Sequence, residues 1–203
     1  MTIHSAHVGR WPLTEKSPEK RTAVMEAALD LFTERGFHGA PTSLIAERAG
    51  VGVGTIYRYF ENKEELIRSI YEELHLRYHE RFTISFEDGV PLQERLTLVL
   101  VQLLAIFIES PREFKFLELY HYSPYADHDR PDIPTEEHNA VRRLLSEGRK
   151  TGVFKDAPLP VLQAIFLGPI VYIAKEHIAG RLNADKTVIE VTKKACWEAL
   201  LNQ

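Results

Sequence analysis

The stretch at residues 42–60 constrains the fold more than any other part of the chain, because it has the pattern of two short helices joined by a glycine turn. Ile45, Ala46 and Ala49 share one helical face, which gives the first helix a side to bury. Gly50 follows as the residue that ends this helix, since glycine adopts the left-handed conformation at little cost. The pattern predicts a compact helical unit.

Start signals and buried positions complete the pattern. We expect Thr42 to be the N-cap of the first helix, with its hydroxyl accepting a backbone N–H of the first turn. Gly52 opens the second helix, in which Ile56 and Phe60 lie four residues apart and form a buried stripe. A short helix with such a small N-terminal end suits a DNA major groove. The residues left to face outward are Val53, Gly54, Thr55, Tyr57, Arg58 and Tyr59.

The run TSLIAERAGVGVGTIYRYFENKEEL resembles the DNA-binding signature of the tetracycline-repressor (TetR) family of bacterial transcription regulators. The small, apolar and polar residues of this run match those of the signature at the same positions, without a gap. The resemblance covers roughly residues 20–66, and the rest of the chain resembles the family in helix count and length. It implies an all-α fold, with a three-helix helix-turn-helix domain followed by a helical domain that binds ligand and dimerises.

The resemblance also implies particular contacts to the DNA backbone. Thr42 and Ser43 would hold a phosphate through hydroxyls and backbone amides. Tyr57 and Tyr59 would reach the sugar-phosphate backbone or stack on thymine methyls. Lys63 would contact a phosphate as a point charge. The alternative for the two tyrosines is that they pack the small domain.

Contacts to base edges are implied for the start of the second helix. Gly54 leaves room for the DNA, and Thr55 offers a hydroxyl and a methyl. Arg58 either binds DNA or pairs with a glutamate three residues further on. Two positions depart from the family: many relatives have Ser at Gly52 and a polar residue at Val53. Val53 has no hydrogen-bonding group, so it would contact a thymine methyl or nothing, and readout would rely more on indirect effects.

Charge alone does not indicate a nucleic-acid partner, since the net charge is −4. Residues 1–63 contain 8 Lys and Arg against 7 Asp and Glu, which is net +1, and the remainder is net −5. This weak basic footprint predicts modest and salt-sensitive non-specific DNA affinity. The single cysteine, Cys196, excludes an internal disulfide and fits a reducing compartment. With no signal peptide and no apolar run long enough to span a bilayer, we expect a cytoplasmic protein.

Helical periodicity continues along the chain and predicts about nine helices and no strand. Residues 1–18 show no period and are predicted to be a flexible arm, whose Arg10, Trp11 and Lys16 can touch DNA or the protein. The expected domains are 19–63 for DNA and 64–203 for ligand and dimerisation. Helices are expected at about 19–35, 42–49, 52–60, 62–82, 91–108, from 111 onward, 135–150, 158–179 and 184–201.

The second domain is rich in aromatic residues, which favours a pocket for a small lipophilic or aromatic effector. The alternative is ordinary core packing of the same side chains. The candidate ligand-binding residues are Phe107, Phe114, Tyr120, His121, Tyr125, Phe166, Tyr172 and His177.

The last two helices are the predicted dimer surface. Between Ile165 and Ile173, apolar residues cover more of the helix circumference than one core-facing stripe would need. This favours burial of the opposite face against a partner. Pro169 lies inside this helix and is expected to kink it. The resemblance implies a four-helix bundle across a two-fold axis. The candidate interface residues are Ile165, Ile170, Val191, Ala195 and Leu200.

Enzymatic function is not indicated. His75 and His79 have a spacing that can hold a metal on one helix face, but no third ligand accompanies them, and two solvent-facing histidines are the simpler interpretation. We therefore expect no metal, no cofactor and no catalysis. The expected function is a ligand-responsive repressor that binds a near-palindromic operator as a homodimer. The alternatives are an activator, or a helical ligand- or metal-binding protein without operator-specific binding.

Overall fold

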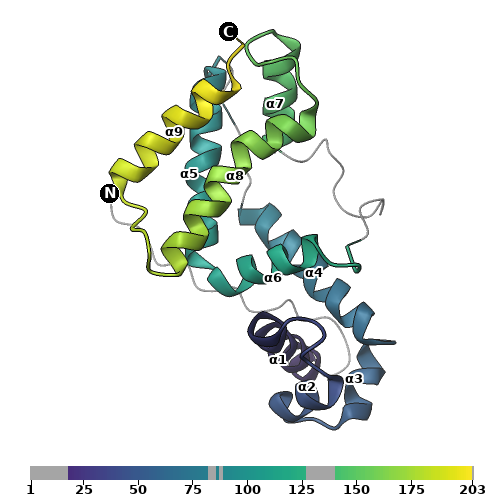
Figure 1. Ribbon diagram of the computed structural model, residues 1–203. Helices are drawn as coiled ribbons and strands as arrows, with labels where there is room; N and C mark the ends of the chain where they lie inside the picture. Colours follow the sequence, from purple (N-terminus) through teal and green to yellow (C-terminus); the bar gives the residue numbers. More distant parts are fainter. Residues whose placement is uncertain (1–17, 82–85, 87–88, 127–139, 203) are drawn as a thin grey trace. The chain divides into compact units, whose positions relative to one another are not determined.

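The computed structural model describes residues 18–81, 86, 89–126 and 140–202. These residues form nine α-helices and no strand, so the predicted all-α fold is confirmed (Figure 1). Residues 1–17 with Arg10, Trp11 and Lys16, residue Phe82, and residues 135–139 lie outside the described part. The helices are Pro18–Arg35 (α1), Thr42–Ala49 (α2), Val53–Tyr59 (α3), Lys63–Arg81 (α4), Leu92–Glu109 (α5), Pro111–His121 (α6), Ala140–Lys150 (α7), Leu159–Ile178 (α8) and Lys186–Leu200 (α9).

The chain forms two compact units, and their boundaries fall inside helices. Of the described residues, unit 1 contains 18–75 and 115–126, and unit 2 contains 76–81, 86, 89–114 and 140–202. Helices α4 and α6 therefore each contribute to both units. Unit 1 is larger than the predicted domain at 19–63, because it also includes most of α4 and the second half of α6.

The core of unit 1 is built on α1. Val24, Ala28 and Phe32 are fully buried at helical spacing, as the amphipathic pattern predicts. Gly36 ends the helix with a positive φ of 72°, and Phe37 follows it into the core. These apolar contacts hold α1 against α2 and α3.

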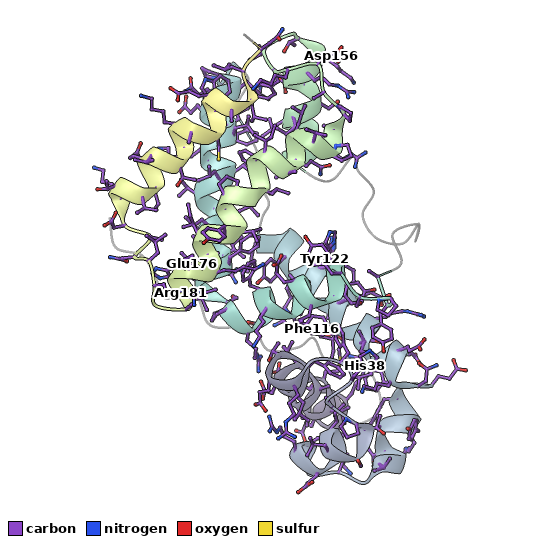
Figure 2. All side chains as sticks on the ribbon, in the orientation of Figure 1. His38, Phe116, Tyr122, Asp156, Glu176 and Arg181 are labelled. Atoms are coloured by element: carbon purple, nitrogen blue, oxygen red, sulfur yellow. The ribbon has the colours of Figure 1, made fainter. Side chains whose placement is uncertain are left out.

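Residues 115–126 complete this core. Phe116, on α6 (Figure 2), is fully buried, with its ring centroid 5.7 Å from that of Phe37 and 6.3 Å from that of Phe32. Tyr120 stacks on Tyr71 of α4 with centroids 4.0 Å apart. A segment distant in sequence from the helix-turn-helix is thus part of the hydrophobic core that supports it.

The first turn of α4 is fixed by reciprocal capping. The Glu65 backbone N–H donates to Asn62 Oδ1 at 2.8 Å, and the Glu65 carboxylate accepts the backbone N–H of Glu61. This arrangement satisfies two backbone donors at the start of the helix. Asn62 is therefore the capping residue of α4.

Unit 2 is organised around α8, which packs against α5, α7 and α9 (Figure 1). Leu162, Phe166, Ile170 and Ala174 of α8 are buried in its core. By length and composition, α8 is also apolar enough to cross a membrane, and 22% of its most apolar window is buried. Among the described residues, its exposed large apolar side chains are those of Val161, Tyr172 and Ile178.

Helix α9 has a buried face and an exposed face. The buried residues are Thr192, Cys196 and Leu200, at four-residue spacing, whereas Val191 is 63% exposed. The helix begins at Lys186 because Asp185 caps it, with Oδ1 accepting the N–H groups of Thr187 and Val188 at 2.9 and 3.1 Å.

Candidate nucleic-acid interface

Helices α2 and α3 are joined by the expected glycine turn. Gly50 has φ 66° and ψ 32°, the left-handed conformation, and the Val51 N–H donates to the Ala46 carbonyl at 3.0 Å. Gly52 is the N-cap of α3 in extended conformation, and its carbonyl accepts the Thr55 N–H at 2.8 Å. The turn is held by backbone hydrogen bonds that depend on glycine at residue 50.

The prediction that Thr42 is the N-cap of α2 was wrong. Pro41 occupies that position, and its carbonyl accepts the N–H groups of Leu44 and Ile45 at 3.0 and 3.2 Å. Thr42 is therefore already inside the helix, and its hydroxyl makes no capping bond. Its Oγ1 atom lies 3.3 Å from the hydroxyl of Tyr57 on α3 instead. This contact brings two predicted phosphate-binding hydroxyls together.

The outward face of α3 contains most of the residues predicted for base edges. Val53 is 39% exposed and Tyr57 is 51% exposed, while Ile56 is buried as expected. Gly52 and Gly54 are exposed, and a Cβ added to either would meet nothing within 4 Å. Thr55 is half-buried. The surface at the start of α3 is open enough for another molecule to approach the backbone closely.

Three further predicted residues have different environments. Ser43 is exposed at the start of α2, and Arg58 is exposed on α3 and forms no ion pair with Glu61 in the described residues. Tyr59 is half-buried and packs against the core of unit 1. Tyr59 thus has a packing role, the alternative considered for it, whereas Ser43 and Arg58 are available at the surface.

Lys63 is not an isolated surface cation. Its ammonium donates to the Phe37 carbonyl at 2.5 Å and lies 5.7 Å from the centre of the Phe32 ring. Partial burial lowers the pKa of this ammonium. The sequence pattern does not reveal this contact, because it joins residues 26 apart in the chain. An ammonium has three donors, so a phosphate contact remains compatible with the bond to Phe37.

The surroundings of the helix-turn-helix are only weakly basic. Arg48 on α2 pairs with Glu34 of α1 at 2.6 Å, and this hydrogen bond lowers the pKa of the Glu34 carboxyl. The pair removes one cation from those available to DNA phosphates. The local structure therefore agrees with the small net charge of this region.

The predicted effector-binding residues are divided between the units. Tyr120, His121 and Tyr125 belong to unit 1. Tyr120 is buried on Tyr71, and Tyr125 packs edge-on against Phe37 with centroids 5.4 Å apart, whereas His121 is exposed. Tyr120 and Tyr125 therefore contribute to the core that supports the helix-turn-helix.

In unit 2, Phe107 and Phe114 stack with ring centroids 4.5 Å apart. Tyr78 adds a third ring 6.4 Å from Phe107, and burial, aided by the nearby Glu113 charge, raises the pKa of its hydroxyl. Helical periodicity places Tyr78 only on a core-facing stripe, so this polar group beside the aromatic pair was missed. It is a further candidate for orienting an effector.

The remaining predicted effector residues lie on α8. Phe166 is 2% exposed and borders a cavity of about 10 Å³, which holds about one water molecule. Tyr172 is 65% exposed. His177 Nδ1 accepts the Ala184 N–H at 3.1 Å and so holds the turn after α8. A larger open groove of about 460 Å³ is lined by Pro91, Gln93, Glu94, Thr97, Glu190, Lys193 and Lys194.

The predicted interface residues fall into two groups. Ile170 and Leu200 are fully buried in the core of unit 2, so neither side chain is available to a partner. Ile165 is half-buried, and Val191 and Ala195 are exposed. Other exposed apolar side chains of α8 are those of Val161, Tyr172 and Ile178. Near the end of this helix, Arg181 binds Glu176 through two hydrogen bonds of 2.7 Å, and the two side chains lie together in Figure 2.

Of the two histidines on α4, the structure describes the side chain of His75. His75 lies beside Tyr71, with ring centroids 5.6 Å apart. No group of three His, Cys, Asp or Glu side chains that could hold a metal occurs within the described ranges.

Two short helices, a left-handed glycine turn and an open second helix define a helix-turn-helix protein. Residues 24–70 match the family described as bacterial regulatory proteins, tetR family. Residues 91–201 match the tetracyclin repressor-like C-terminal domain. The chain belongs to the tetR family of bacterial regulators, as the resemblance of residues 42–66 predicted.

Similar proteins agree with this assignment. The fatty acid metabolism regulator protein of Bacillus subtilis is 35% identical over 88 residues, which is 43% of this chain and 45% of that protein. The chain spans about half the length of the curated relatives it matches.

Solved structures match over most of the chain. A TetR family transcription regulator of Marinobacter aquaeolei matches with a TM-score of 0.76 and 26% identity, over 91% of this chain and 97% of that one. The regulator FadR of Bacillus subtilis, in complex with stearoyl-CoA, matches with a TM-score of 0.66 and 21% identity, over 88% of this chain and 98% of that one. The second likeness bears on the fold alone.

Proposed function

We propose that this protein is a transcription regulator that places α3 in the major groove of operator DNA. The observation that supports this most directly is the helix-turn-helix, with Val53, Gly54 and Tyr57 exposed on one short helix. Membership of the tetR family supports the same function. Thr42, Ser43, Tyr57 and Lys63 are the proposed phosphate contacts, and Arg58 is an additional cation at the same surface.

We further propose that the protein acts as a homodimer through α8 and α9. Apolar side chains that a soluble monomer would bury are exposed on both helices, among them Tyr172 and Val191. A two-fold axis would present two α3 helices to the two halves of a near-palindromic operator. The centres of the half-sites would lie roughly one DNA turn apart or somewhat more.

The regulator is proposed to be a cytoplasmic repressor released by a small lipophilic effector. The fatty acid regulator of Bacillus subtilis and the stearoyl-CoA complex of its FadR make long-chain acyl-CoA the first compound to test. Effector binding would favour a state in which α4 is displaced and the two α3 helices no longer fit the grooves. It shifts this equilibrium only through its different affinities for the two states.

An effector that binds among the aromatic residues of unit 2 requires a conformational change there. The cavity beside Phe166 has a volume of about 10 Å³, whereas ligand pockets measure roughly 300 to 1,000 Å³. The Phe107–Phe114 stack and the Tyr78 hydroxyl are the proposed wall of the opened pocket. Separating these rings would expose an apolar surface and one polar group, which suits a lipophilic molecule with a polar end.

DNA binding is tested by fluorescence anisotropy with DNA from the promoter region of the protein's own gene. We expect a saturable complex whose affinity falls steeply with salt. Tyr57→Ala should weaken it about 10- to 100-fold, whereas Tyr122→Ala should leave it unchanged, because Tyr122 is 83% exposed outside the helix-turn-helix. Absence of a specific complex would favour a ligand-binding protein that does not regulate through an operator.

Dimerisation is tested by light scattering after size-exclusion chromatography. Val191→Glu should shift the protein to a monomer, because it places a charge in the proposed interface. Val153→Glu is the control, since Val153 is an exposed valine on the turn after α7. A Val191→Glu protein that remains dimeric would contradict the assignment of α9.

The effector is tested by adding stearoyl-CoA to the preformed DNA complex, with free coenzyme A as the control. Release of DNA by stearoyl-CoA alone is expected. Release by both compounds would show that the nucleotide part suffices, and release by neither would contradict an acyl-CoA effector. Transcription in vitro from the same promoter distinguishes repression from activation.

A further inference from the structure

The first turn of α3 presents an apolar group where a base-reading helix commonly carries a polar one. Val53 is 39% exposed, and it is not among the half-buried residues that pack against the core of unit 1. A large part of its surface is therefore open to solvent in the free protein. Its neighbours Gly52 and Gly54 have no side chains, and the space around both is open.

The other polar side chains of α3 are less available to a base at the start of the helix. The Tyr57 hydroxyl lies 3.3 Å from Thr42 Oγ1, which ties its polar end to α2. Thr55 is half-buried, and Arg58 lies near the other end of the helix. Val53 is consequently the side chain that projects at the start of α3, and it cannot donate or accept a hydrogen bond.

The major groove offers one apolar group on its base edges, the C5-methyl group of thymine. Contact between this methyl and an exposed isopropyl group removes apolar surface from water on both partners. A cytosine or purine at the same place would offer polar atoms that Val53 leaves without a partner, which costs affinity.

From these observations we infer that Val53 is a specificity-determining residue, which recognises a thymine methyl in each operator half-site. This inference rests on the proposed function as a DNA-binding regulator. It deepens that function by assigning sequence readout at the start of α3 to an apolar contact.

The experiment replaces each thymine of the operator in turn by deoxyuridine, which lacks only the C5-methyl group, symmetrically in both half-sites. At one thymine, the affinity of the wild-type protein should fall about fourfold for each methyl removed, or about 15-fold for a symmetric pair. In Val53→Ala the same replacement should change the affinity less than about twofold per half-site, because most of the partner surface is gone.

Val153→Ala is the matched control, since it shortens an exposed valine in unit 2 and should keep the full thymine effect. Thermal melting confirms that Val53→Ala is folded, as expected for an exposed position. No specific complex with unmodified DNA would contradict the proposed function itself. A specific complex in which no thymine methyl matters, or in which its effect persists in Val53→Ala, would overturn the inference about Val53.

Discussion

Units 1 and 2 both bury well-packed aromatic cores, but they differ in what they leave at the surface. Unit 1 buries Phe32, Phe60 and Phe116. Its helix α3 exposes glycines and a few separate side chains that are available to contact DNA. Unit 2 buries Phe154 and Phe166, yet exposes apolar side chains along α8 and α9. The two surfaces therefore suit different partners: a polar, grooved surface for unit 1 and another apolar helix face for unit 2.

The difference also concerns chain connectivity. The helix-turn-helix is encoded within about 25 consecutive residues, 42–66, but the core beneath it requires Phe116 and Tyr120 from α6. A DNA-binding domain that looks continuous in the sequence is thus discontinuous in the structure. A mutation in α6 is expected to act on unit 1.

The largest effect is expected for Phe116→Ala, which should lower the free energy of unfolding of unit 1 by about 3–5 kcal/mol. Phe116 is fully buried between the rings of Phe32 and Phe37. Amide hydrogen exchange, resolved at the level of peptides, should be faster in α1 and α2 of this variant than in the wild-type protein. Phe154→Ala is the control in unit 2 and should act first on α7 and α9. Equal effects of both variants on both units would show that the two cores unfold together.

A large effect is also expected for the reactivity of Cys196 in unit 2. Burial raises the pKa of this thiol to about 11, and the thiol is 2% exposed. Each pKa unit lowers the thiolate fraction tenfold, so alkylation at pH 8 should be about 100-fold slower than for a free cysteine. The denatured protein supplies the reference rate. Equal rates in the folded and denatured protein would contradict burial of this side of α9.

The same thiol makes a stability contribution with a defined sign. Because its folded pKa is raised, the unfolded chain releases its proton first as the pH increases. The contribution is fully present below the unfolded pKa of about 9 and is lost as the pH rises through about 11. The loss should be smaller in Cys196→Ala, measured by urea denaturation at pH 8 and pH 10.

A moderate effect is expected for Lys63→Met. It removes a proposed phosphate contact and the hydrogen bond to the Phe37 carbonyl. Operator affinity should fall about tenfold, and the slope of log affinity against log salt should decrease by about 0.9 per protomer. Lys63→Arg keeps the charge and should keep the slope. An unchanged slope in Lys63→Met would mean that Lys63 only supports unit 1.

The smallest effect is expected for Thr42→Val at the start of α2. Together with Asp185→Ala at the start of α9, it compares helix capping in the two units. Because Thr42 is not the N-cap, its loss should change stability by less than about 0.5 kcal/mol. Asp185→Ala removes the true side-chain cap of α9 and should cost about 0.5–2 kcal/mol. Urea denaturation measures both. A larger cost for Thr42→Val than for Asp185→Ala would contradict the capping assignments.

Much of the fold was predictable because its determinants are local. Gly50 fixes the turn between α2 and α3, and the stripe of Ile56 and Phe60 fixes the buried side of α3. The start of α2 was predicted wrongly, because the preference for a threonine cap was outweighed by the Pro41 carbonyl, which already accepts two N–H groups. The position of a helix start is therefore decided by the backbone hydrogen bonds that form, and the preference of one residue type for the N-cap does not suffice to predict it.

The candidate sites were predicted less evenly. Tyr57 and Val53 are exposed on α3 where the family signature indicates, since a short helix has few ways to bury its stripe. Lys63 and Tyr59 also contact the body of unit 1, and Tyr120 packs against Tyr71. These contacts join residues far apart in sequence, so no periodicity or motif reveals them.

The sequence by itself determined that the chain is helical, where its helix-turn-helix lies and which family it belongs to, because these depend on neighbouring residues. Only the tertiary structure decided that Phe116 supports unit 1, that Leu200 is buried and that Val191 is exposed. Whether an apolar side chain lies inside or outside depends on which distant helix packs over it. That choice is made by the core as a whole.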